Sequence, residues 1–151
     1  MQALLVIHNL LRWLIILFGL WAVIRAIGGL AGKRVYGPGD DRSSLLYSIS
    51  MDIQFLVGIA LYYVGDWFDR LKHFSQSVND PATRFFTIEH ESMMIVALIL
   101  VHMGRVFVKK SATSPGKFTR SLLFYGIALL IILMAVPWPF KEVARPWFRW
   151  F

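Results

Sequence analysis

Apolar side chains gather in four long blocks along the chain, and polar stretches rich in glycine, proline and charge separate them. Each block is long enough to cross the hydrocarbon core of a bilayer as a helix, which takes about 20 residues. The pattern predicts transmembrane helices over residues 3–30, 44–65, 86–108 and 121–140. The expected fold class is therefore all-α: a polytopic membrane protein whose single membrane domain, residues 1–151, is a four-transmembrane-helix bundle.

The connections between the blocks carry their own signals. Residues 37–41 are a dense cluster of turn formers, and Ser43 or Ser44 is expected to cap the second helix. The longest connection includes apolar residues that recur at helical spacing among charged ones, namely Trp67, Phe68, Leu71 and Phe74. This spacing is typical of a short helix lying in the membrane interface. Asp80-Pro81 is expected to end that helix.

Composition narrows the class of protein further. The chain is 57% hydrophobic and 17% charged, whereas a soluble domain is about 25% charged, so a soluble enzyme is excluded. The absence of cysteine excludes a disulfide framework, a thiolate-bound iron–sulfur cluster and covalent c-type haem attachment. The net charge of +7 comes from basic residues at the ends of the apolar blocks. These residues favour lipid headgroups over nucleic acid as partners.

Basic residues are distributed unequally between the two sides of the membrane. The side that holds the first and third connections has nine, and the side that holds the termini and the second connection has six. The positive-inside rule therefore predicts a cytoplasmic location for the first and third connections. Both termini are expected on the opposite side.

Two ionisable residues lie within the first block. His8 and Arg12 are four residues apart and share one helix face. That face continues through small residues, Gly19, Ala22 and Ala26, which let a neighbouring helix approach closely. We therefore expect the stripe to face the bundle. Ionisable groups at membrane depth are costly, so they are candidate functional residues.

His90 is the matching residue of the third block. It lies about as far into its helix as His8 does, and the two helices run in the same direction. Two neutral imidazoles at one depth could be the axial ligands of a single b-type haem. The alternative is structural: Arg12 needs an anion, which Glu89 or Glu91 would supply, and both histidines would join a hydrogen-bonded cluster that fastens the two helices. A metal other than haem iron is a third possibility.

A second candidate pair lies towards the other side of the membrane. Asp52 and His102 fall at comparable depth on antiparallel helices. They are expected to form a buried acid–imidazole pair, which either serves proton uptake or a quinone headgroup or simply satisfies both groups. His90 and His102 are 12 residues apart and do not share one face, so a two-haem site is not expected.

Several strings in order along the chain carry a family resemblance: residues 8–13 (HNLLRW), 54–63 (QFLVGIALYY), 84–90 (RFFTIEH) and 137–140 (PWPF). Together they resemble a family of small bacterial four-helix membrane proteins labelled cytochrome b-like. The resemblance implies one b-type haem bound by His8 and His90, and a location in the bacterial inner membrane. Relatives often have a histidine where this chain has Asp52.

With the resemblance added, the expected role is an electron-transfer or haem-associated subunit of a respiratory-type complex, with other membrane subunits as partners. The alternative is a non-catalytic accessory subunit that packs against a larger membrane complex. The chain contains no nucleotide-binding motif and no nucleophile constellation, so a stand-alone enzyme is not expected.

The expected topology can be tested by labelling. Single cysteines replace Ser114, in the third connection, or Ser77, in the second, of a chain that has no cysteine of its own. An impermeant thiol reagent applied to intact cells should modify the Ser77→Cys variant and leave Ser114→Cys unlabelled until the cells are lysed. The reverse pattern would put His8 and His90 on the cytoplasmic side.

Overall fold

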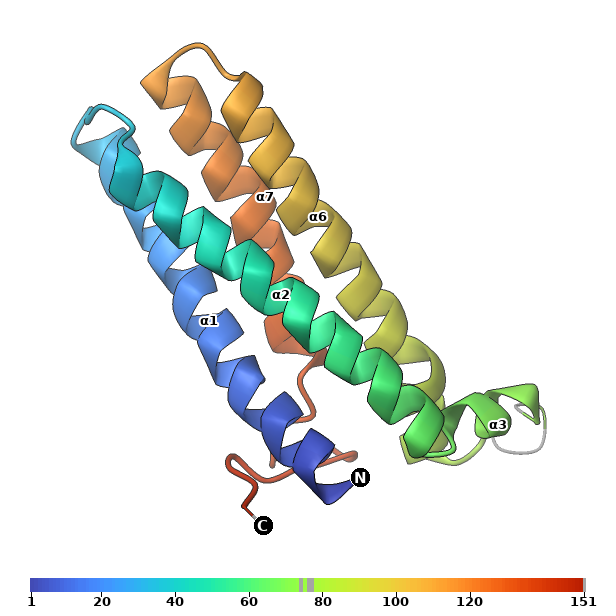
Figure 1. Cartoon of the computed structure of the whole chain (residues 1–151). Coiled ribbons are helices and arrows are strands. Elements are labelled where there is room, and N and C mark those ends of the chain that lie inside the picture. Colours follow the sequence, from blue (N-terminus) through green and yellow to red (C-terminus); the bar gives the residue numbers. More distant parts are fainter. Residues whose placement is uncertain (74, 76–77, 151) are drawn as a thin grey trace.

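Four long helices form the body of the protein, and each one passes from one end of the bundle to the other (Figure 1). The computed structural model describes residues 1–73, 75 and 78–150. The helices are α1 (Gln2–Ala31), α2 (Pro38–Val64), α6 (His90–Lys110) and α7 (Ser114–Ala135). Within the described part of the chain there is no β-strand. The predicted all-α, four-helix membrane fold is confirmed.

Shorter elements join α2 to α6. They are the helix α3 (Trp67–Lys72), the helix α5 (Pro81–Arg84) and a π-helical segment η1 (Phe85–Glu89) that runs directly into α6. α3 confirms a short helix in this connection, although Phe74 and Ser77 lie outside the described residues. Asp80 does not end that helix. Its side chain accepts a hydrogen bond from the Thr83 amide, 2.8 Å, and caps α5 instead.

The expected start of α2 is wrong by almost two turns. The helix begins at Pro38 because proline suits the first helical position, where no intrahelical N–H bond is needed. Asp40 accepts a hydrogen bond from the Gly37 amide at 2.9 Å and so stabilises this end. Ser43 and Ser44 therefore lie inside the helix, where their hydroxyls donate to carbonyls one turn earlier.

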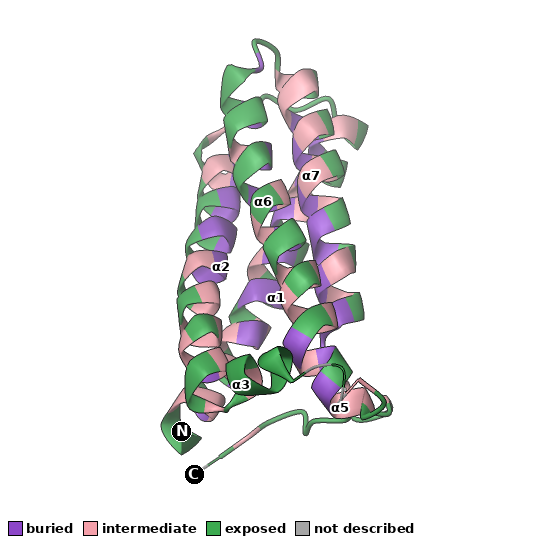
Figure 2. Ribbon diagram, turned by 90° about the vertical axis from the view of Figure 1, so that its right-hand side faces the viewer, coloured by how far each residue is buried: buried purple, intermediate pink, exposed green. Residues whose placement is uncertain are grey.

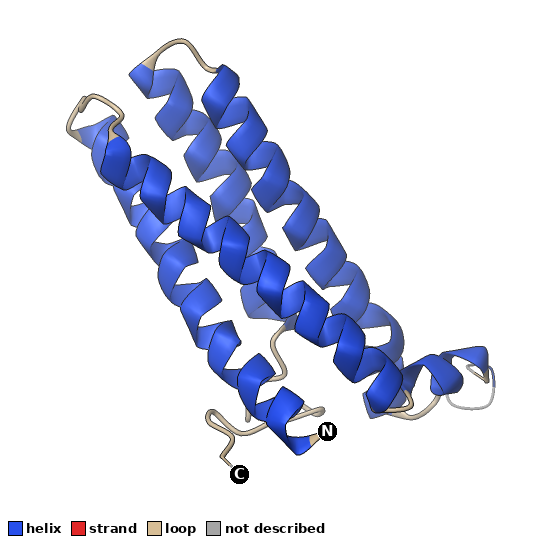
Figure 3. Ribbon diagram, in the orientation of Figure 1, coloured by secondary structure: helices blue, strands red, loops and turns tan. Residues whose placement is uncertain are grey.

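The fourth span is also displaced from its expected bounds. α7 begins at Ser114, after the Thr113 hydroxyl, which accepts a hydrogen bond from the Gly116 amide at 3.3 Å. It ends at Ala135, shortly before Pro137. Residues 137–150 then fold back beneath the bundle, next to the N-terminus of α1 (Figure 3). We call them the C-terminal segment.

The small residues predicted to face the bundle do so. Gly19, Ala22 and Ala26 of α1 are all buried. Ala97 and Val101 of α6 are buried as well. The core also includes Tyr47, Met51, Tyr125, Ala128 and Ile132. The outward faces of the long helices are exposed (Figure 2), and many of their exposed residues are large and apolar. All four spans have the length and apolar composition to cross a membrane, which makes this a multi-pass membrane protein.

Adjacent glycines at the end of α1 provide a test of this packing. A side chain at Gly29 would overlap the ring of Phe118, whereas one at Gly28 would meet open space. We expect Gly29→Ala to cost about 1–3 kcal/mol of stability through overpacking. Gly28→Ala should be neutral or stabilise by up to about 1 kcal/mol, since alanine favours helix.

The measurement is thermal unfolding of the detergent-solubilised protein followed by circular dichroism. Phe118→Leu should restore part of the loss in Gly29→Ala. Equal midpoints for the two alanine variants would contradict the close approach of α1 to Phe118.

Candidate functional site

The structure brings His8 and His90 together, as their matching depth predicted. Their ring centroids are 6.3 Å apart, and the ring planes make an angle of 61°. His8 comes from the second turn of α1, and His90 is the first residue of α6 after the π-helical segment. Two side chains from separate helices therefore face one space.

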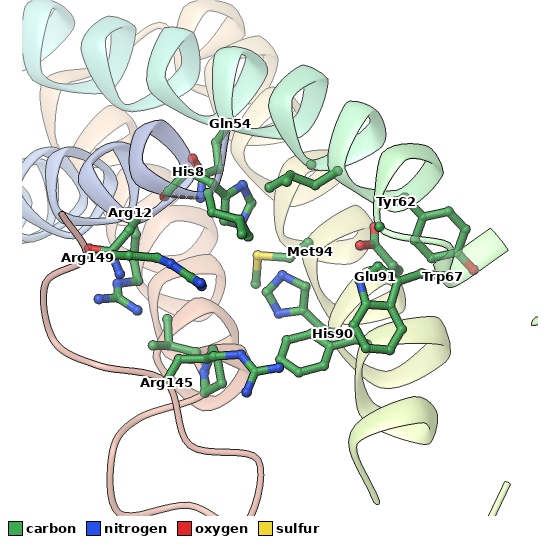
Figure 4. Close-up of a pocket in the computed structure, with 18 of the residues that line it drawn as sticks. His8, Arg12, Gln54, Tyr62, Trp67, His90, Glu91, Met94, Arg145 and Arg149 are labelled. Atoms are coloured by element: carbon green, nitrogen blue, oxygen red, sulfur yellow. Dashed lines mark hydrogen bonds between the residues drawn. The ribbon is translucent and has the colours of Figure 1, made fainter. Parts of the chain in front are cut away.

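That space is a cavity of about 610 Å³ at the end of the bundle that holds both termini (Figure 4). Its volume falls within the range of about 300–1,000 Å³ that small-molecule sites occupy. Most of the lining is apolar and includes Ile15, Met51, Leu61, Phe86, Met94 and Ile132. The helices α1, α2, α6 and α7 and the C-terminal segment all contribute to it.

The orientation of His90 is set by one hydrogen bond. Its Nδ1 lies 3.0 Å from the carbonyl oxygen of Ala135. That carbonyl is available because α7 ends there, and the residue four positions later is Pro139, which has no N–H to donate. A carbonyl can only accept, so Nδ1 carries the proton and Nε2 keeps a free lone pair. This arrangement is typical of a metal-ligating histidine.

His8 has an unsatisfied ring nitrogen. Its Nδ1 is buried and has no hydrogen-bond partner among the described residues. Its backbone carbonyl accepts a hydrogen bond from Gln54 of α2 at 3.1 Å, which fixes α1 against α2 at this level. Gly58, one turn further along α2, lies beside the ring, and a Cβ there would be in ordinary van der Waals contact with His8 Cε1 at 3.6 Å. A buried nitrogen without a partner is costly, and a bound group would relieve that cost.

The number of protein ligands restricts which metal could bind. Nowhere in the described residues do three or more histidine, aspartate or glutamate side chains gather as a metal site. A zinc site takes three or four protein ligands. A haem iron needs only the two axial ones. The two imidazoles therefore suit an iron whose remaining ligands come from a macrocycle better than they suit a bare ion.

The predicted ion pair between Arg12 and a glutamate is wrong. Arg12 donates instead to the backbone carbonyl of Trp147, 2.6 Å away in the C-terminal segment. Glu89 pairs with Arg84 at 2.8 Å, because a π-helical turn brings residues five apart onto one face. Glu91 lines the cavity and forms no ion pair with any described residue. Arg12 thus bonds to a main-chain carbonyl. Because every residue has one, the sequence does not identify this partner.

Two arginines of the C-terminal segment are site residues that sequence reasoning did not identify. Arg145 and Arg149 line the cavity beside Arg12, and Arg145 stacks on the ring of Phe86 at 4.7 Å (Figure 4). Partial burial lowers the pKa of Arg145, and the positive charge of Arg149 lowers it further. This end of the cavity therefore favours an anionic group. The alternation of arginine and tryptophan in the C-terminal segment could have indicated that these residues belong to a site. The same pattern is also typical of a membrane anchor.

Asp52 and His102 form a pair as predicted, with 2.7 Å between Asp52 Oδ1 and His102 Nε2. The expectation that this pair is buried is wrong, because the two side chains are 47% and 50% exposed. Asp52 follows Met51, which faces the core, and so points away from it. The pair lies apart from His8 and His90 and lines a different cavity.

The contact between Arg12 and Trp147 gives a testable expectation. Arg12→Leu removes a charge-assisted hydrogen bond worth about 1.5–3 kcal/mol, so the C-terminal segment should open about tenfold to a hundredfold more often. Tryptic cleavage after Lys141 should accelerate accordingly in the detergent-solubilised protein. Glu91→Gln should leave that rate unchanged, alone or combined with Arg12→Leu. Rescue of Arg12→Leu by a glutamate substitution would restore the ion-pair model.

Comparison of the chain with models of protein families, with curated proteins and with solved structures gives no match. The resemblance to cytochrome b-like proteins therefore stays a prediction. The fold and the geometry of the site rest on the residues described above.

Proposed function

We propose that this protein is an electron-transfer or haem-associated subunit of a bacterial membrane complex, and that His8 and His90 hold one b-type haem between α1 and α6. The observation that carries the proposal is the approach of two imidazoles, 6.3 Å apart, across a largely apolar cavity. A metal–nitrogen bond is about 2 Å long. Two imidazole rings whose centroids lie 6.3 Å apart are therefore close enough to bind one metal ion between them.

The lining matches the two chemical parts of a haem. The apolar wall suits the macrocycle, and the cationic end of the cavity suits its two carboxylates. Arg145 and Arg149 are the residues that would pair with those carboxylates, since Arg12 already bonds to Trp147. His8 and His90 both line this cavity.

A haem bound here would supply one-electron chemistry. The protein's own residues determine how that chemistry is tuned. Ala135 orients the His90 ring through its carbonyl, and Gln54 holds the backbone of His8. Phe86 and Met94 contribute apolar side chains to the cavity wall. Burial and hydrogen bonding to the axial ligands are the means by which a protein sets a haem potential.

The proposed location follows from the side on which the cavity lies. Both termini and the cavity occupy one end of the bundle (Figure 1). The excess of basic residues at the other end favours a periplasmic position for the termini. We infer that electrons enter or leave on that side, through neighbouring membrane subunits.

The test is a reduced-minus-oxidised absorption spectrum of the gently purified protein. The wild type should show a b-type spectrum, and His8→Ala and His90→Ala should each abolish it. His102→Ala is the matched control: it removes a histidine from the same helix as His90 but outside the cavity, and should leave the spectrum intact.

Circular dichroism separates loss of haem from loss of fold. A folded, colourless wild type would contradict haem binding and favour the accessory-subunit alternative. A spectrum that survives in His8→Ala would overturn the assignment of the ligands. Loss of the spectrum in His102→Ala alone would move the site to the Asp52 side of the bundle.

A further inference from the structure

The pair formed by Asp52 and His102 lies at the middle of the membrane. Arg42 and Tyr62 are each ten residues from Asp52 along α2, which at about 1.5 Å per residue puts each about 15 Å away. Arginine and tyrosine are typical of the headgroup level. Because the hydrocarbon core is about 30 Å thick, Asp52 and His102 lie near its midplane.

The pair faces outward at that depth. Both side chains are about half exposed, and their mutual hydrogen bond uses one polar atom of each. No other described residue bonds to the second carboxylate oxygen of Asp52 or to Nδ1 of His102. Polar groups exposed to hydrocarbon are costly and mark functional positions. One donor or acceptor on each side chain is therefore free for a bound molecule.

The pair opens into a groove between α2 and α6, the neighbouring long helices that pack least closely against each other. The groove has a volume of about 510 Å³. Its walls are mainly Leu45, Ile49, Met103, Val106 and Phe107, and its polar residues are Ser48, Arg105 and Lys109 besides the pair itself.

Three observations identify the kind of occupant. The volume is that of a small-molecule site, and a transmembrane helix, about 10–12 Å across, does not fit inside it. A phospholipid headgroup would lie at the level of Lys109, seven residues and about 10 Å along α6 from His102, and so does not reach the pair. The remaining class is a lipid-soluble molecule that carries oxygen atoms able to accept from His102 or donate to Asp52.

We propose that this groove binds a quinone or quinol, with one ring oxygen hydrogen-bonded to Asp52 and His102. Because Nε2–H of His102 donates to Asp52, a quinol hydroxyl can donate to the second oxygen of Asp52 or to the lone pair on Nδ1 of His102. The imidazolium form of His102, with both ring nitrogens protonated, can donate from Nδ1 to a quinone carbonyl. The site is separate from the haem cavity: Met51 lines that cavity and Asp52 lines this groove, about 100° away around α2. The proposal does not depend on haem being bound.

The test uses the full-length protein in phosphatidylcholine nanodiscs and an azido-benzoquinone photolabel, displaced by a decyl-substituted benzoquinone. Labelling should map to peptides of α2 or α6 and be saturable. Asp52→Asn and His102→Gln should each weaken the apparent Kd roughly tenfold, the effect of losing a hydrogen bond to such a group. Leu56→Ala, an exposed residue of α2 outside the groove, is the control and should change nothing.

Two further variants keep the result unambiguous. Val106→Trp fills the groove without touching the polar pair and should prevent labelling even if Asp52→Asn fails to fold. His8→Ala should bind the quinone as the wild type does, which separates this proposal from haem binding. Unsaturable labelling of the wild type, or equal Kd values for Asp52→Asn and Leu56→Ala, would overturn the proposal. So would efficient disulfide dimerisation of Met103→Cys in membranes, which would mean that a second copy covers the groove.

Discussion

The structure depends on one constraint: within hydrocarbon, a polar group must find its partner in the protein or in a bound molecule. Arg12 meets this constraint in part: Nη2 donates to the carbonyl of Trp147, and the buried Nε has no partner among the described residues. His90 meets it with the carbonyl at the end of α7. His8 and the pair of Asp52 with His102 meet it only in part. His8 lines the cavity at the end of the bundle, and the pair of Asp52 with His102 lines the groove between α2 and α6.

The bundle itself could be predicted from the sequence because its signals are local. Twenty or more apolar residues in a row specify a span regardless of what surrounds it. The helix ends were harder to predict, because glycine, proline and aspartate are frequent both in turns and in first helical turns. Residues 37–41 suit either structure, and the hydrogen bond between Gly37 and Asp40 decides for the helix.

In the site, the pairs of residues that lie at equal depth along their helices could be predicted from the sequence. The other contacts could not. His8 with His90, and Asp52 with His102, follow from equal distances along helices of known length. The partner of Arg12 could not be found in this way, since every residue carries a carbonyl and only the path of the C-terminal segment selects Trp147. The exposure of the Asp52 side chain could not be predicted either, because it depends on how closely α2 and α6 approach each other.

The C-terminal segment also affects how the protein is assembled. Ala144, Arg145, Pro146 and Arg149 form part of the cavity wall, and Trp147 is bonded to α1. Ribosomes synthesise chains from the N-terminus, so these residues emerge after all four helices are made. During biogenesis the cavity therefore exists first as an open cleft, into which a large molecule can enter sideways. Docking of the C-terminal segment against α1 then completes the wall of the cavity.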